Sequence, residues 1–437
     1  MPSAIAAIAA IVAGVFDRLG PQQPPQQAIP RPEGAVVTTP AAVFDRLGPQ
    51  PSAQRLLQPD EEQVTAEDGV LYTDLVREFK SYAFTAQVVQ VIIRAGRFDR
   101  ERQQQRWYRE YEIKAILERW ILNVAQEGAI HNLPTQMLDH EYGRNKFVAE
   151  LQEVRKIKMT AAQAEAALAG VHRARDQVDA DLQALADAKT PITLQWDTQD
   201  GMNMSLGRRA ELHVHVPTTK RVAAILKRAS KGKTVKEGLA HTARILLRYT
   251  AHLHTSAQHW GPIQPIFDHL LKHFGVRHEG FASPLNSRAI LSDEDCTYCT
   301  LYGDTDGVAG SLGSFFNQDL LMDEHNWTVH PPFTETLLTS TAAKVLSSLQ
   351  EAKDKGRQLI LGVGWCDWTD MQCFKDLLAS GFKRMHHSLP KNGYHFELPD
   401  GSLKVATFVN HYFLFSALDL TPEQAAQVPE LGRLVQA

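Results

Sequence analysis

The sequence has no apolar run approaching the roughly 18 to 20 residues that a membrane-spanning helix requires, so no such helix is predicted. Cysteine is scarce, with four residues in 437, which argues against a disulfide-stapled secreted protein and favours a reducing compartment. Charge of either sign is not in large excess. The formal net charge of −4 excludes a surface that binds polyanions along its whole length, so any affinity for nucleic acid must be local.

What remains is an ordinary globular composition, with 43% hydrophobic and 22% charged residues, in a chain long enough for two or three domains. The first segment differs from the rest. Residues 1–62 are rich in Pro, Gln and Ala and poor in aromatics, which predicts a disordered tail. The octamer VFDRLGPQ occurs there twice, at residues 15–22 and 43–50. The repeat could dock a protein partner, although we prefer a duplicated spacer without one.

Residues 63–250 have the pattern of a mainly helical domain. Apolar residues recur at three- and four-residue spacing in 71–97 and 107–127, and 146–189 is a long run of Ala, Glu, Gln and Arg. We expect this last run to be one long helix packed on its own domain, with a coiled-coil arm as the alternative. Residues 211–216 alternate as in a strand, and we interpret His213 and His215 as its exposed face rather than as metal ligands.

The helical region ends in a run of positive charge. Nine cations with one acidic residue, Glu237, between them would form a local phosphate-binding surface, and a solvated helix face is the alternative. We therefore expect an RNA-binding surface here, with Arg221 and Lys227 among its contacts. The nine are Lys220, Arg221, Lys227, Arg228, Lys231, Lys233, Lys236, Arg244 and Arg248.

Residues 251–437 alternate between strand and helix patterns, which predicts an α/β domain. Residues 358–364 form an apolar strand pattern, 369–379 a helix and 405–415 a long β-branched and aromatic run. Such alternation implies a parallel sheet with ligands at the carboxyl ends of its strands. A short strand at 327–329 would deliver His330 to that edge.

The sequence His330-Pro331-Pro332-Phe333 suits the recognition of a flat base, about fifty residues after Phe281. A rigid Pro-Pro turn with an aromatic behind it can present backbone carbonyls and a ring face. The exocyclic amine of adenine is a poor nucleophile, so N6-methylation needs acceptors for its N–H groups, a stacked ring and an in-line methyl donor.

Other motifs are weaker alone. Asp304-Thr305-Asp306-Gly307, with Gly310 and Gly313 beyond it, could contact a ribose or an amino group, but a surface turn is the commoner origin of such a sequence. The chain lacks both the Gly-x-Gly-x-x-Gly fingerprint and the phosphate-binding Gly-Lys-Ser/Thr loop, which disfavours dinucleotide enzymes and nucleoside triphosphatases. We do not expect the four cysteines to form a zinc site because the second pair is loosely spaced.

Taken in order, these blocks resemble the catalytic region of the phosphorylated CTD-interacting factor family, over about residues 275 to 418. That family comprises cap-specific adenosine-N6 methyltransferases that act on 2′-O-methyladenosine next to the mRNA cap. No WW module, the usual reader of the polymerase tail, is expected, because the first tryptophan is Trp107. The resemblance is carried by Phe281-Ala282-Ser283-Pro284-Leu285-Asn286, Tyr298-Cys299, Asp304-Thr305-Asp306-Gly307, Gly310-Ser311-x-Gly313 and Pro331-Pro332-Phe333-x-Glu335.

The resemblance implies a Rossmann-like methyltransferase domain and a set of site residues. Residues 330–334 would hold S-adenosylmethionine and the adenine, the carbonyl of Pro331 accepting an amine N–H and Phe333 stacking on the base. Glu335 would contact substrate and Trp365 would lie near the cap. Cofactor contacts are expected from Thr334, Asn286, Asp304, Asp306 and Gly307.

The expected function is therefore N6-methylation of adenosine in RNA with S-adenosylmethionine as cofactor, in the nucleus by family inference, with the cytoplasm as the alternative. The position of His330 usually carries Asn, Asp or Ser. A neutral imidazole could accept one N–H of the amine, whereas a protonated ring could only donate and would repel the sulfonium. The alternative is thus a catalytically impaired protein that binds RNA or cap, or serves as a scaffold, on a methyltransferase fold. A DNA or protein substrate also stays open.

Overall fold

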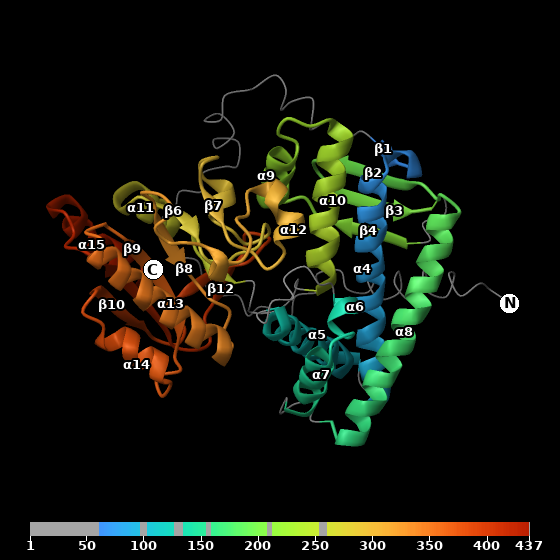
Figure 1. Cartoon of the computed structure of the whole chain (residues 1–437), viewed down its shortest axis with the longest axis horizontal. Coiled ribbons are helices and arrows are strands. Elements are labelled where there is room, and N and C mark those ends of the chain that lie inside the picture. Colours follow the sequence, from blue (N-terminus) through green and yellow to red (C-terminus); the bar gives the residue numbers. More distant parts are fainter. Residues whose placement is uncertain are drawn as a thin grey trace, which may run out of the picture.

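The computed structural model describes residues 61–96, 103–125, 134–153, 159–207, 212–252 and 260–436. An N-terminal part that is mainly helical lies beside a C-terminal part built on a sheet (Figure 1). The expected mixed α/β architecture, with the helical part first, is confirmed at this level. The predicted tail and its repeated octamer lie outside the described residues, except that residues 61 and 62 begin strand β1 (Glu61–Val64).

Long amphipathic helices dominate the first part. Helix α4 (Val70–Ala95) buries Leu75, Phe79 and Ile92 at helical spacing, and α8 (Ala161–Asp187) packs along it. A Cβ atom on Gly170 of α8 would lie 2.6 Å from the Val91 side chain, so glycine permits this close approach. The remaining helices of this region are α5 (Gln103–Ala125), α6 (Pro134–Met137) and α7 (Glu141–Glu153).

The single long helix expected over residues 146–189 is wrong, because that run holds two helices. α7 ends at Glu153, and α8 begins after Thr160. The Thr160 hydroxyl accepts a hydrogen bond from the Gln163 N–H at 3.3 Å, and the Gln163 side chain accepts one from the Thr160 N–H at 2.9 Å. This reciprocal capping box starts a new helix.

A four-stranded antiparallel sheet completes this part, in the order β1-β2-β3-β4. Its later strands are β2 (Ile192–Asp197), β3 (Gly201–Leu206) and β4 (Leu212–Val216). The predicted strand over residues 211–216 is confirmed as β4, with His213 and His215 exposed between buried apolar residues. Helices α9 (Lys220–Ala229) and α10 (Val235–His252) follow, and the expected boundary near residue 250 falls at the end of α10.

The second part is a six-stranded sheet in the order β10-β13-β9-β8-β6-β7. Strands β7, β6, β8 and β9 pair in parallel, whereas β13 runs antiparallel to both β9 and β10. The expected parallel sheet is thus correct for its first four strands only. The strands are β6 (Val276–Glu279), β7 (Thr297–Tyr298), β8 (Asn326–Val329), β9 (Ile360–Cys366), β10 (Lys383–Leu389) and β13 (Asn410–Ser416).

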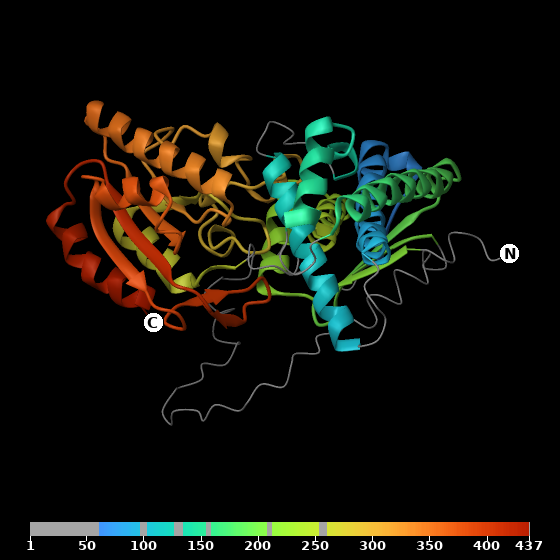
Figure 2. The same ribbon diagram turned by 90° about the horizontal axis from the view of Figure 1, so that it is seen from below.

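Helices cover both faces of this sheet (Figure 2). Side chains alternate along β13, so Phe413 and Phe415 enter the core with α13 (Glu335–Asp354) and α14 (Gln372–Ala379). Leu414 enters the core that contains α11 (Gln264–Phe274) and α15 (Pro422–Gln436). This burial of both faces explains the continuous apolar run in the sequence.

The pattern expected over residues 405–415 is divided between two sheets. Strand β12 (Leu403–Val405) belongs to a small antiparallel sheet in the order β12-β11-β5, with β11 (His395–Glu397) and β5 (Gly261–Pro262). Short helical turns lie at Ala66–Asp68, Ala289–Leu291, Gly303–Asp306 (α12), Gly307–Ala309 and Phe315–Asn317. Among the described residues, no helix is both long and apolar enough to cross a membrane.

Candidate active site

The carboxyl ends of β6 and β8 flank the point where the order of the parallel strands reverses. The chain leaves β6 for β7 on one side and then returns to β8 on the other side. Ligands of open α/β sheets bind at such a switch point, because the connections diverge there and leave a crevice. The loop after β6 carries Phe281 to Asn286, and the corner after β8 carries His330 to Phe333, so the two predicted blocks meet at this edge.

The loop after β6 is shaped by hydrogen bonds to two side chains. The Asn286 carbonyl oxygen accepts from the Ser283 N–H at 2.6 Å and from the Ser283 hydroxyl at 3.0 Å. The buried Glu279 carboxylate accepts from the Ser287 hydroxyl at 2.8 Å and the Arg288 N–H at 2.9 Å. Burial raises the pKa of Glu279, with Arg288 acting in the opposite direction. These bonds hold the loop against the strand end.

The corner after β8 is a proline-stiffened turn that leads into α13. The Pro332 carbonyl accepts from the Thr334 N–H at 2.9 Å, and the Thr334 hydroxyl caps α13 by accepting from the Leu337 N–H at 3.4 Å. Thr334 is buried, and Glu335 is exposed in the first turn of α13. Any contact between Thr334 and the cofactor would therefore have to come from its backbone or from the hydroxyl that caps α13.

His330 is half-buried at this corner, and its imidazole Nε2 lies 3.2 Å from the Thr328 hydroxyl. The Tyr412 ring meets it edge-on, with the ring centroids 5.7 Å apart. Burial, followed by the charge of Arg288, lowers the pKa of His330 to about 4. The ring is therefore neutral near pH 7 and keeps one acceptor nitrogen.

Two cavities meet at His330. The larger has a volume of about 220 Å³, and aromatic rings (Phe281, Phe315, Phe316) and polar groups (Ser283, Asn286) line it. Leu122 and Glu118 of α5 also reach it, so the helical part contributes to its wall. Burial raises the pKa of the Glu118 carboxyl well above its ordinary value.

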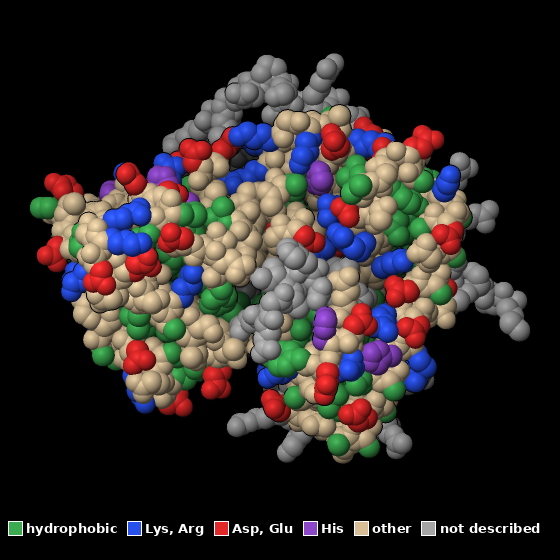
Figure 3. Space-filling model, viewed as in Figure 1, with side chains coloured by type: hydrophobic (Ala, Val, Ile, Leu, Met, Phe, Trp, Pro, Cys, Tyr) green, Lys and Arg blue, Asp and Glu red, His purple; other side chains and the backbone are tan. Residues whose placement is uncertain are grey.

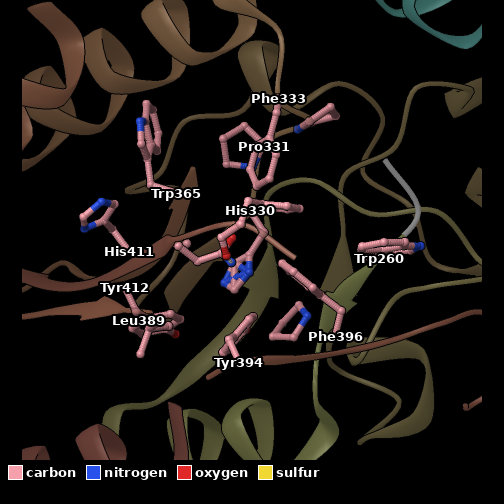
Figure 4. A pocket seen from close by; sticks show the side chains of 15 residues that line it. Trp260, His330, Pro331, Phe333, Trp365, Leu389, Tyr394, Phe396, His411 and Tyr412 are labelled. Atoms are coloured by element: carbon pink, nitrogen blue, oxygen red, sulfur yellow. Dashed lines mark hydrogen bonds between the residues drawn. The ribbon is translucent and has the colours of Figure 1, made fainter. Parts of the chain in front are cut away.

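The smaller cavity, of about 40 Å³, is lined mainly by aromatic rings and prolines. Trp260, Trp365, Tyr394 and Phe396 surround His330 (Figure 4). Phe333 also lines it and meets Phe408 edge-on, with the ring centroids 5.9 Å apart. The two cavities share a wall formed by Trp260, Pro262, His330 and Pro332. A flat ring placed in the smaller cavity would lie next to a ligand in the larger one.

Three of the expected cofactor contacts lie elsewhere. Asp304 is in α12, where Arg248 of α10 donates to its carboxylate at 3.1 Å. Asp306 is fully buried and accepts a hydrogen bond from the Tyr249 hydroxyl; burial raises its pKa to about 7. These side chains and Gly307 do not line either cavity, and the two carboxylates join α12 to the helical part.

The expected RNA contacts Arg221 and Lys227 have different environments. Arg221 is buried and donates to the Glu397 carboxylate at 2.8 Å, so its guanidinium is not at the surface. Lys227 is exposed, 3.4 Å from Glu294, and Lys231 lies 2.9 Å from the same carboxylate. Neither Arg221 nor Lys227 lines a cavity.

Most of the basic run is taken up by internal contacts. Arg228 donates to the carbonyls of Ala289 and Cys296 at 2.9 and 3.0 Å, and Arg244 pairs with Asp74 at 2.9 Å. Arg248 is buried against Glu78. On the face shown in Figure 3, lysine and arginine side chains are interspersed with acidic ones rather than gathered in one patch.

Aromatic residues of the small sheet were not anticipated as part of the site. Tyr394 directly precedes β11, Phe396 lies in it and Phe408 follows β12. Trp260 precedes β5, which pairs with β11. The available indication in the sequence was that these four aromatic residues lie in or near short strands. Their meeting depends on a pairing between residues more than 130 positions apart, Phe396 with Pro262.

Residues 225–398 match the family model described as "Phosphorylated CTD interacting factor 1 WW domain". The match begins within α9, extends just past β11 and includes both the loop after β6 and the corner after β8. The description names a WW domain, yet the matched residues form helices together with strands β6 to β10 of the larger sheet. No curated protein matches the chain. Over residues 225–398, the chain is similar to the phosphorylated CTD interacting factor 1 family, and this match supports membership in that family.

Proposed function

We propose that this protein methylates the N6 amine of adenosine in RNA, with S-adenosylmethionine in the larger cavity and the adenine at the corner after β8. The observation that carries the proposal is the shared wall: His330 and Pro332 separate a mixed polar and aromatic cavity from an aromatic one at the switch point of the sheet. Methyl transfer needs two ligands side by side in this way.

The lining of the larger cavity is compatible with S-adenosylmethionine. Phe281, Phe315 and Phe316 offer ring faces to an adenine, and Ser283 and Asn286 offer polar groups to a ribose or an amino acid moiety. The strand order supports this use, because the carboxyl ends beside a switch point are where nucleotide-like ligands bind in open α/β sheets. When bound, S-adenosylmethionine supplies an electrophilic methyl group.

The chain's own residues would prepare the amine. Phe333 would stack on the base, and the Pro331 carbonyl would accept one amine N–H. Neutral His330 would accept the other N–H, because the depressed pKa of its imidazole leaves one ring nitrogen unprotonated near pH 7. The main contribution of these residues would be to orient the amine so that its lone pair faces the methyl donor. The enclosed aromatic wall would exclude water.

RNA is the substrate class that we favour, through the family relationship and the exposed lysines Lys220, Lys227, Lys231 and Lys233 at the edge of α9. Cap-adjacent 2′-O-methyladenosine is the specific target implied by the resemblance. The family description also refers to a phosphorylated CTD, which we include as a candidate protein partner, and with it a nuclear location.

A transfer assay tests the proposal directly. The full chain would be given methyl-labelled S-adenosylmethionine with capped RNA beginning with 2′-O-methyladenosine, the same RNA without a cap, and DNA of the same sequence. We expect label in N6-methyladenosine from RNA, with the capped substrate preferred. Thermal stabilisation by the cofactor would be measured in parallel; at a hundred times its dissociation constant it adds about 2.7 kcal/mol. Cofactor binding without transfer to any substrate would favour a non-catalytic binding protein, and no cofactor binding would refute the proposal.

A further inference from the structure

The Thr328 hydroxyl in β8 lies between two groups that flank the site. Its oxygen is 3.2 Å from His330 Nε2 and 3.2 Å from the carbonyl oxygen of Gly362 in β9. Thr328 is 2% exposed, and its register partner in the parallel pair is Gly362. The hydroxyl therefore meets the sheet on one side and the imidazole on the other, and the Tyr412 hydroxyl is a further hydrogen-bond neighbour that can donate to its second lone pair.

The number of protons decides the direction of these hydrogen bonds. A hydroxyl has one proton, and a carbonyl can only accept. If Thr328 donates to the Gly362 carbonyl, its oxygen can accept from a protonated Nε2, and both contacts are hydrogen bonds. If Thr328 instead donates to Nε2, its oxygen faces the carbonyl without a proton between them. Only the first arrangement satisfies both contacts, and buried polar groups favour full satisfaction.

The remaining ring nitrogen then becomes the acceptor. A neutral imidazole carries one N–H and one lone pair, so a proton on Nε2 places the lone pair on Nδ1. The Tyr412 ring fixes the imidazole edge-on, and the ring faces Gly364, where no side chain blocks it. Arg288 is the charged group that acts on the imidazole, and it disfavours a second proton.

We propose that Thr328 is a positioning residue that selects the Nε2–H tautomer of His330, so that Nδ1 accepts an N–H of the substrate amine. This inference rests on the function proposed above for the same site. It assigns a role to a residue within β8 that makes no contact with the cavities. It also explains how a histidine can work at a position where an amide or carboxylate oxygen would otherwise accept the amine.

The tautomer can be observed without any reaction. The full chain would be labelled with ¹⁵N in its 18 histidines, and the His330 signals would be assigned by their loss in His330→Asn. At pH 7 we expect a protonated Nε2 and an unprotonated Nδ1 for His330. A protonated Nδ1 in the wild-type chain would overturn the inference.

Kinetics then test whether the tautomer matters. Thr328→Val keeps the shape but removes the hydroxyl, and we expect kcat to fall roughly 10- to 100-fold, as when a partner that orients a histidine is removed. The KM for S-adenosylmethionine should stay close to that of the wild type. Thr328→Ser keeps the hydroxyl and should retain most of kcat and the wild-type tautomer. If Thr328→Val changes neither the tautomer nor kcat, the assignment fails.

Thr341→Val is the matched control for the loss of a buried threonine hydroxyl. Thr341 is fully buried in α13, and its hydroxyl has no hydrogen-bond partner among the residues that the structure describes. This variant should leave both kcat and the His330 spectrum unchanged. Should Thr328→Val fail to fold, Thr328→Ser and the wild-type spectrum still decide the tautomer. Absence of methyl transfer in the wild type, with the expected tautomer present, would refute the proposed function and not the hydrogen-bond assignment.

Discussion

Gly364 in β9 faces the imidazole of His330 so closely that a Cβ atom at position 364 would lie 3.2 Å from both Cδ2 and Nδ1 of that ring. Glycine at this position therefore defines where the imidazole can lie. His330 directly follows β8 and Gly364 lies in the neighbouring parallel strand β9, next to the register pair of Val329 and Val363, so the sheet itself sets their separation.

Gly364→Ala should push the His330 ring by a few tenths of an ångström and lower kcat on the order of tenfold, because transfer is sensitive to small misplacements of the acceptor. Cofactor affinity should be nearly unchanged. Gly381→Ala is the control, since a Cβ atom at that position meets nothing within 4 Å. Steady-state kinetics of the two variants would check this, and equal kcat values would contradict the placement of His330.

Phe333→Ala should reduce methyl transfer strongly, because stacking of a base on an aromatic ring contributes about 1–3 kcal/mol. Binding of S-adenosylmethionine, measured by calorimetry, should persist. Phe382→Ala serves for comparison, since its ring is also half-buried but lies outside both cavities. Equal turnover by wild type and Phe333→Ala would show that the base does not stack there.

The depressed pKa of His330 also predicts a pH dependence of stability. The unfolded chain takes up a proton on this residue below pH 6.5, whereas the folded chain does so only near pH 4. Protonation therefore favours unfolding, and this contribution to the free energy of unfolding falls as the pH drops from 6.5 towards 4. Urea unfolding at pH 7 and pH 5 should show a smaller loss in His330→Asn than in the wild type. An identical loss in both chains would mean that the imidazole is not shielded from water.

Arg248→Ala should destabilise the protein by about 3–5 kcal/mol, because it leaves the buried Glu78 carboxylate without its main partner and removes the bond to Asp304. Arg433→Ala breaks an exposed pair with Glu430 on α15 and should change the free energy of unfolding little. Denaturant unfolding of both variants gives the comparison. A small effect at Arg248 would show that the junction between α10 and α12 contributes little to stability.

Much of the site could be predicted because it depends on the local strand pattern and on the rule that ligands bind at the carboxyl ends of parallel strands. Trp327 to Val329 form a buried strand, and carboxyl ends of parallel strands share one edge, so His330 and Phe281 meet as expected. What could not be predicted depends on distant partners. Arg221 and Arg248 contribute to a positive run in sequence, yet their surroundings include Glu397 and Glu78, about 170 or more positions away. The surroundings of Asp304 and Asp306 also depend on distant partners, since Arg248 and Tyr249 of α10 donate hydrogen bonds to their carboxylates.

The antiparallel strand β13 has hydrogen-bonded neighbours on both sides, and β10 joins the sheet only through it. If β13 separates from β9, β10 therefore separates from the rest of the sheet with it. Tyr412 and Asn410 of β13 line the aromatic cavity, so opening of this pair of strands would also dismantle that wall. The wall proposed to bind the base therefore opens only together with the paired strands β10 and β13, and not as a separate loop.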